Sequence, residues 1–165
     1  MWSSSISSLL QWRRRSDYIQ YSIKMRQCLQ TGSNYELRKP WIKLNNMLES
    51  RHGTILSRER NNTNHIHLYA YGIYWAAFEQ SAYQLCRLFP ESGTAIMQIK
   101  GYPFPAVMAF LPDKKLYNSA VLYPIRTVTP DYKILAVPDL IPSRFRSWYS
   151  RRLKQYAEIQ HLINQ

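Results

Sequence analysis

Two histidines separated by one residue, His65 and His67, are the first candidates for chemistry in this sequence. In an extended segment, residues i and i+2 project from the same side of the chain, so both imidazoles would be available to one zinc ion. A zinc site needs further ligands, and His52, His161 and the cysteines follow no ligand spacing. We therefore expect surface histidines here, with no metal ion and no other cofactor.

Glu79 is the second candidate, because it is the only acidic residue between Glu59 and Glu91 and lies in an apolar segment. Desolvation raises the pKa of a carboxyl group in such surroundings, which can then act as a general acid or base. The alternative is a structural carboxylate held by a hydroxyl group or an arginine. No second catalytic group has a motif spacing to Glu79, so the sequence favours a non-enzymatic protein.

Basic residues dominate the charge of the chain. Its 165 residues include 22 Lys and Arg against 10 Asp and Glu, a net charge of +12. The excess lies at the two ends: residues 1–60 carry 11 basic and 4 acidic side chains, residues 61–140 carry 6 and 5, and residues 141–165 carry 5 and 1. The candidate nucleic-acid-binding residues come from these ends and are Arg13, Arg14, Arg15, Arg51, Arg58, Arg60, Arg144, Arg146, Arg151 and Lys154.

Three functional hypotheses follow from these groups. Arginine clusters near aromatic residues favour binding to RNA or single-stranded DNA, where phosphate contacts combine with base stacking. The first hypothesis is therefore a non-enzymatic basic accessory protein that binds nucleic acid or a ribonucleoprotein. The second is a protein-interaction module whose basic ends dock an acidic partner or an anionic membrane surface. The third, with the least support, is a small enzyme that uses Glu79 and a histidine.

Two segments bear on localisation and topology. Residues 1–15 form a basic, serine-rich and acid-free N-terminal arm, a composition typical of mitochondrial targeting segments. We expect an intracellular protein, either mitochondrial or cytoplasmic. The longest uncharged stretch, 61–78, is interrupted by polar residues, so we expect no transmembrane segment.

Apolar spacing predicts the helices that position these groups. We expect one helix over 16–30 and a second from about 40 to 52, ended by Gly53. A third, long core helix is predicted because seven apolar residues recur at steps of three and four. These residues are Leu68, Tyr71, Trp75, Phe78, Ala82, Leu85 and Phe89.

Proline spacing predicts the rest of the fold. Eight of the nine prolines fall between residues 90 and 142, a density that suits short strands. We expect strands over 94–100, 105–111, 119–125 and 132–137, joined by turns tight enough for an antiparallel meander. The predicted fold class is α+β: three N-terminal helices, a four-stranded antiparallel meander and a C-terminal amphipathic helix from Pro142, in one domain of residues 16–165. On a helical wheel of that last helix, Arg152 lies on the apolar face and is expected to pair inside the fold or to stack on Trp148. The other four basic residues are expected to face outward: Arg144, Arg146, Arg151 and Lys154.

Overall fold

The structure is a computed structural model that describes residues 35–99, 101–118 and 122–163. The chain divides into two units, Met1–Arg38 and Lys39–Gln165; the start of one helix, Tyr35–Arg38, belongs to the first unit, and all other elements described below lie in the second. The predicted N-terminal arm and the predicted helix over 16–30 lie outside the described residues.

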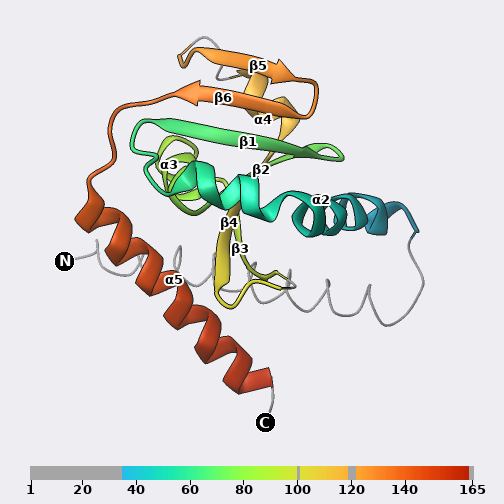
Figure 1. The fold of residues 1–165 in the computed structure, drawn as a ribbon, viewed down its shortest axis with the longest axis vertical. Helices are drawn as coiled ribbons and strands as arrows, with labels where there is room; N and C mark the ends of the chain where they lie inside the picture. Colours follow the sequence, from blue (N-terminus) through green and yellow to red (C-terminus); the bar gives the residue numbers. More distant parts are fainter. Residues whose placement is uncertain (1–34, 100, 119–121, 164–165) are drawn as a thin grey trace, which may run out of the picture. The chain divides into compact units, whose positions relative to one another are not determined.

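The centre of the second unit is a six-stranded sheet in which all neighbouring strands are antiparallel (Figure 1). The strand order across the sheet is β3-β4-β2-β1-β6-β5. The strands are β1 (His65–Tyr71), β2 (Tyr74–Phe78), β3 (Gly93–Gln98), β4 (Pro105–Pro112), β5 (Ile125–Thr129) and β6 (Tyr132–Ala136).

Four helices accompany the sheet: α2 (Tyr35–Glu59), α3 (Glu79–Leu88), α4 (Asp113–Asn118) and α5 (Pro142–Ile163). Helix α3 packs against β1, β2 and β4, and α5 packs against α3 and the β3–β4 pair. In Figure 1, α2 lies across the sheet and α5 runs past its β3–β4 end. Among the described residues, no helix combines the length and the apolar character that crossing a membrane requires.

Side-chain alternation along the central strands produces two separate cores. On β1, Ile66 and Leu68 pack with Ala82 and Leu85 of α3, whereas Tyr69 and Tyr71 pack on the α2 side. The α2 side is completed by Leu44, Leu48 and Ile55 of α2 together with Phe78, Met97 and Met108. The sheet is therefore covered by α2 on one face and by α3 on the other, as the period of two along a strand requires.

The predicted core helix over 68–89 is wrong as an element, although its seven apolar residues are all buried. Residues up to Phe78 form the β1–β2 hairpin, and only α3 is helical. The hairpin turns at Gly72, whose φ of +65° suits glycine and whose added Cβ would lie 3.1 Å from Pro40. Because the apolar run before Phe78 is almost continuous, its helical spacing is a by-product of burial on both faces of the sheet.

Some of the remaining predictions about the fold are confirmed, and others are wrong. The α+β class, the C-terminal helix and the strands near 94–100, 105–111 and 132–137 are confirmed, but the four-stranded meander is wrong because β1 and β2 join the sheet. Gly53 does not end the second helix, which continues to Glu59. The predicted strand over 119–125 is wrong in its described part, since β5 begins only at Ile125.

Candidate functional site

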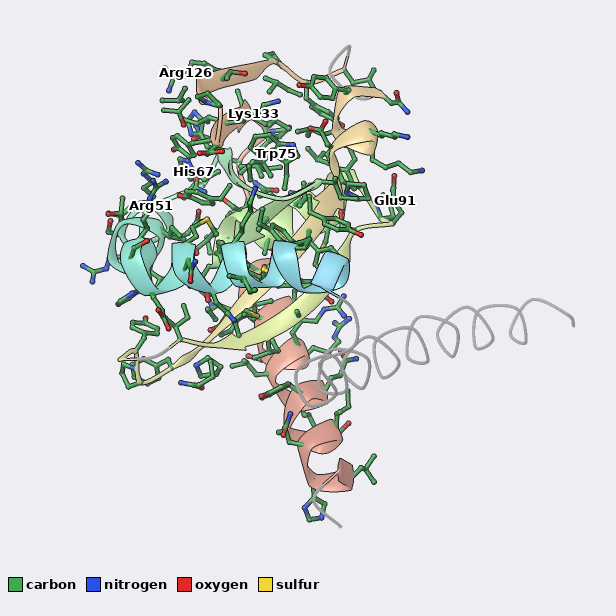
Figure 2. All side chains as sticks on the ribbon, turned by 90° about the vertical axis from the view of Figure 1, so that its right-hand side faces the viewer. Arg51, His67, Trp75, Glu91, Arg126 and Lys133 are labelled. Carbon is green, nitrogen blue, oxygen red and sulfur yellow. The ribbon has the colours of Figure 1, made fainter. Side chains whose placement is uncertain are left out.

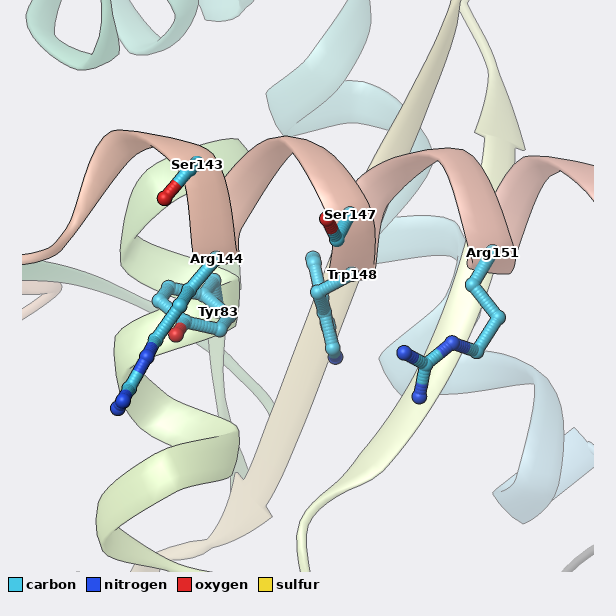
Figure 3. Close-up of a pocket in the computed structure, with 6 residues that line it drawn as sticks. All are labelled: Tyr83, Ser143, Arg144, Ser147, Trp148 and Arg151. Atoms are coloured by element: carbon cyan, nitrogen blue, oxygen red, sulfur yellow. The ribbon is translucent and has the colours of Figure 1, made fainter.

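A groove on the surface brings together arginine, aromatic and hydroxyl side chains. Its volume is about 360 Å³, and six residues line it: Tyr83 of α3 and Ser143, Arg144, Ser147, Trp148 and Arg151 of α5. We call it the α5 groove. Figure 3 shows Arg144, Trp148 and Arg151 extending from the same side of α5. Their spacing of four and three residues places them on one stripe of a helix, so the two guanidinium groups flank the indole.

The aromatic floor of the α5 groove is held by packing inside the fold. The Tyr83 and Trp148 ring centroids lie 5.5 Å apart with the ring planes tilted by 58°. The Arg152 guanidinium carbon lies 5.6 Å from the Trp148 ring centroid, and that of Arg87 lies 5.7 Å from the Tyr83 ring centroid. The predicted stacking of Arg152 on Trp148 is confirmed. Cations therefore surround this aromatic pair.

The other predicted basic residues of α5 do not line the groove. Arg146 and Lys154 are exposed, as are Arg144 and Arg151, so all four point outward as the helical wheel indicates. Of these four residues, only Arg144 and Arg151 line the α5 groove with its aromatic residues. The structure thus separates the predicted set on α5 into two groove residues and two residues of the open helix surface.

The predicted basic cluster of residues 51–60 lies at the end of α2. Arg51 and Arg60 are exposed, and Arg60 lines a different cleft. Arg58 has internal partners: its guanidinium carbon lies 4.3 Å from the Tyr132 ring centroid, and Nη1 donates a 3.2 Å hydrogen bond to the Tyr69 hydroxyl. Arg13, Arg14 and Arg15 lie outside the described residues.

His65 and His67 lie on β1 and face the same side of the sheet, as their spacing predicts. Their ring centroids are 6.2 Å apart, and His67 Nδ1 lies 2.7 Å from the Tyr132 hydroxyl (Figure 2). Burial, with the nearby Arg58 charge, lowers the pKa of His67 to about 4. In the described ranges, no group of three or more His, Cys, Asp or Glu side chains is placed to hold a metal ion.

Glu79 begins α3, and the structure does not bring it to either of these histidines. Its Oε1 accepts a 3.1 Å hydrogen bond from the Val107 backbone N–H. Desolvation raises the pKa of Glu79 to about 7 against the lowering effect of this hydrogen bond. The pKa of Glu79 is therefore raised, as its apolar surroundings indicated, but neither His65 nor His67 is its partner.

Glu59 is a second carboxyl group with a raised pKa, and sequence reasoning missed it. It is only 2% exposed, and it accepts hydrogen bonds from the Ser81 backbone N–H, the Ser81 hydroxyl and the Asn62 amide. Desolvation raises its pKa to about 7 despite these three donors. Glu59 lies between Arg58 and Arg60 in the sequence, and such a run of charged residues is typical of an exposed loop. Nothing in the sequence therefore indicated that Glu59 is buried.

The aromatic half of the α5 groove was also missed. The sequence places Trp148 on the apolar face of the last helix and indicates no role for Tyr83, so it does not predict that both rings reach a surface groove. The only available signal was the serine and arginine spacing around Trp148. No protein-family model, no curated protein and no solved structure matches this chain.

Proposed function

We propose that the protein binds single-stranded nucleic acid, RNA or DNA, through the α5 groove. The observation that carries the proposal is the placement of Arg144 and Arg151 on either side of Trp148, with the Tyr83 ring beside Arg144. Guanidinium groups bind phosphate, and the aromatic faces offer a surface on which a base can stack. Ser143 and Ser147 add hydroxyl groups that can donate to phosphate oxygens.

The charge of the whole chain supports the same ligand. A net charge of +12 attracts polyanions from a distance, and none of the six groove residues is acidic. The groove is short, so we expect it to contact a few nucleotides and the surrounding basic residues to add unspecific phosphate contacts. Since stacking tolerates every base, the expected binding has little sequence preference.

Fluorescence anisotropy with a labelled 12-nucleotide single strand tests the proposal. The variant Arg144→Gln/Arg151→Gln is expected to weaken binding at least about tenfold. It should also reduce the slope of log affinity against log salt concentration by about 1.4, because two fewer phosphate contacts release fewer counterions. The matched control is Arg146→Gln/Lys154→Gln, which removes the same charge from exposed positions of α5 outside the groove. We expect the control variant to bind within about threefold of the parent.

Two outcomes contradict this assignment. Equal loss of affinity in the groove variant and in the control would mean that net charge alone drives binding. Binding of the parent that is weaker than micromolar, or that does not change with salt, would mean that nucleic acid is not the ligand.

A further inference from the structure

A second cleft, of about 450 Å³, opens at the end of the sheet where β2 ends and β4 begins. We call it the acidic cleft. Its lining joins α2, the start of α3, the β3–β4 connection and α5. The lining residues that bear on its chemistry are His52, Arg60, Glu79, Tyr102, Phe104 and Tyr149.

The backbone of Glu79 has an unusual conformation. Its φ is +50°, and it is the only residue other than glycine with a positive φ among the described residues. A long side chain in the left-handed region costs free energy, and such positions cluster at functional sites. The strained backbone and the hydrogen bond from Val107 fix the carboxyl group at the cleft.

The Tyr149 hydroxyl lies between two possible hydrogen-bond acceptors, the Glu79 carboxyl group and the Pro105 carbonyl oxygen at 3.2 Å, and it has one proton to donate. It donates to Glu79 when that carboxyl is ionised, which lowers the pKa of Glu79, and it can donate to Pro105 and accept the proton of Glu79 when that carboxyl is neutral. Burial and the adjacent Glu79 raise the pKa of Tyr149, so the hydroxyl does not lose its own proton. This site therefore accommodates both protonation states of Glu79 near neutral pH, as a group that transfers protons requires.

His52 supplies the second proton-transfer group. Its Nδ1 lies 2.9 Å from the Leu48 carbonyl oxygen, which can only accept, so Nδ1 carries a proton. This bond fixes the orientation of the ring and leaves Nε2 for a ligand in the cleft. The neighbouring Tyr102 ring, with its centroid 6.5 Å away, extends the aromatic lining toward Phe104.

We propose that the acidic cleft cleaves RNA, with Glu79 as the general base, His52 as the general acid and Arg60 as the phosphate-binding group. This proposal rests on the proposed function, since the substrate must first bind. Arg60 is the exposed cation of the lining, and Phe104 is 64% exposed, as expected of a ring on which a base stacks. RNA carries its own nucleophile, the ribose 2′-hydroxyl, so one base and one acid suffice.

The reaction balances within the substrate and these two side chains. The Glu79 carboxylate takes the proton of the 2′-hydroxyl, and the 2′-oxygen forms a bond to the adjacent phosphorus. The bond from phosphorus to the 5′-oxygen of the next nucleotide breaks, and the leaving oxygen takes a proton from Nε2 of protonated His52. The products are a 2′,3′-cyclic phosphate and a free 5′-hydroxyl. Proton exchange with water restores both side chains.

The test uses the full chain with a labelled 12-nucleotide RNA and a 2′-deoxy strand of the same sequence, modified by replacing U with T. We expect both strands to bind and only RNA to be cut, to fragments that end in a 2′,3′-cyclic phosphate. Glu79→Gln and His52→Ala are each expected to reduce the cleavage rate at least about 100-fold. The matched control is Glu49→Gln, at an exposed position of α2 outside the cleft, which should cut RNA at the parental rate.

The outcomes separate the two proposals. If the parent binds RNA but leaves it intact, the cleavage proposal is wrong and the binding proposal stands. Cleavage at the parental rate by Glu79→Gln, purified in parallel, would identify a contaminating nuclease and overturn the proposal. If Glu79→Gln fails to fold, His52→Ala decides alone, because His52 lies on the surface of α2 where alanine favours the helix. If neither strand binds, both proposals are wrong.

Discussion

Glu59 and Ser81, 22 residues apart in the sequence, are joined by two hydrogen bonds. The Ser81 backbone N–H donates to Glu59 Oε2 at 2.9 Å, and the Ser81 hydroxyl donates to Glu59 Oε1 at 2.7 Å. The N–H groups in the first turn of a helix have no partner within that helix. No side chain of the residue before α3 caps it, so the last residue of α2 provides that partner instead. These two hydrogen bonds connect the end of α2 to the start of α3, which the β1–β2 hairpin separates in the sequence.

Ser81→Ala is expected to lower the free energy of unfolding by about 1–3 kcal/mol. The substitution removes the donor to Glu59 Oε1 and the acceptor of the His67 backbone N–H, and both groups are then left without that partner. Urea denaturation measures the change. Ser50→Ala, at an exposed position of α2, is the control and should change stability by less than about 0.5 kcal/mol. Equal stability of the two variants would show that the Glu59–Ser81 contact contributes nothing.

Gly53→Ala is expected to stabilise the protein by about 0.5–1 kcal/mol. Gly53 lies inside α2, and an added Cβ would meet nothing within 4 Å, so alanine gains helix propensity without a clash. Gly93→Ala is the opposite case, because a Cβ there would overlap the Phe110 ring. We expect Gly93→Ala to lower the melting temperature and Gly53→Ala to raise it. A lower melting temperature for Gly53→Ala would contradict the continuous helix.

Trp75→Ala is expected to cost roughly 3–5 kcal/mol, because the side chain is buried in the α3-side core. Trp75 Nε1 also donates a 2.6 Å hydrogen bond to Asp113, and the Lys133 ammonium lies 4.5 Å from its ring centroid (Figure 2). Trp75→Phe keeps most of the volume and removes the hydrogen bond, so it should cost less, about 1–2 kcal/mol. Guanidinium denaturation distinguishes the two. If Trp75→Ala and Trp75→Phe lower the free energy of unfolding equally, only the polar contacts of Trp75 contribute to stability and its burial does not.

The protein is expected to be more stable at pH 5 than at pH 8. Burial raises the pKa of Glu59 and that of Glu79 to about 7, from 4.5, so between those values the folded state binds more protons than the unfolded chain. Stability therefore falls as the pH rises through that window. His67 has the opposite effect, because its pKa is lowered to about 4: its contribution to stability rises between pH 4 and 6.5. The two carboxyl groups together outweigh this single histidine.

The expected loss between pH 5 and pH 8 is roughly 1–3 kcal/mol, at about 1.4 kcal/mol for one proton over one pH unit. Urea denaturation at the two pH values measures it. Glu79→Gln should reduce the difference, since one of the two titrating carboxyl groups is removed. A parent protein that is more stable at pH 8 would show that these carboxyl groups are ionised in the fold.

The sequence predicted burial better than it predicted backbone shape. All seven residues of the 68–89 pattern are buried, yet Leu68 and Trp75 lie on one face of the sheet and Tyr71 and Phe78 on the other. A run that is apolar on both faces has no period of two, so it can match a helical spacing by chance. The residue that distinguishes the two structures is Gly72, which has no role inside a helix but whose positive φ is required by the turn of the β1–β2 hairpin.

The sites were less predictable because they depend on contacts between distant segments. The outward arginines of α5 followed from its wheel, but the groove also needs Tyr83, whose helix was assigned with the wrong start. Glu79 was identified from its apolar surroundings. That Glu79 and His52 line the same cleft depends on how α2 packs beside the start of α3, which local spacing does not show.

The order of the strands has a consequence for the exchange of backbone hydrogens with solvent. Within the described residues, β5 bonds only to β6, and four of its five side chains are exposed, whereas β1 and β2 lie at the centre of the sheet. Amide groups at such an edge open without the rest of the sheet, and those at the centre exchange only when most of the structure unfolds. Deuterium would therefore enter β5 first and the β1–β2 hairpin last. That hairpin connects the two helices joined by Glu59 and Ser81, so the slowest-exchanging segment of the described residues also lies between Glu59 and Glu79, the two carboxyl groups with raised pKa values.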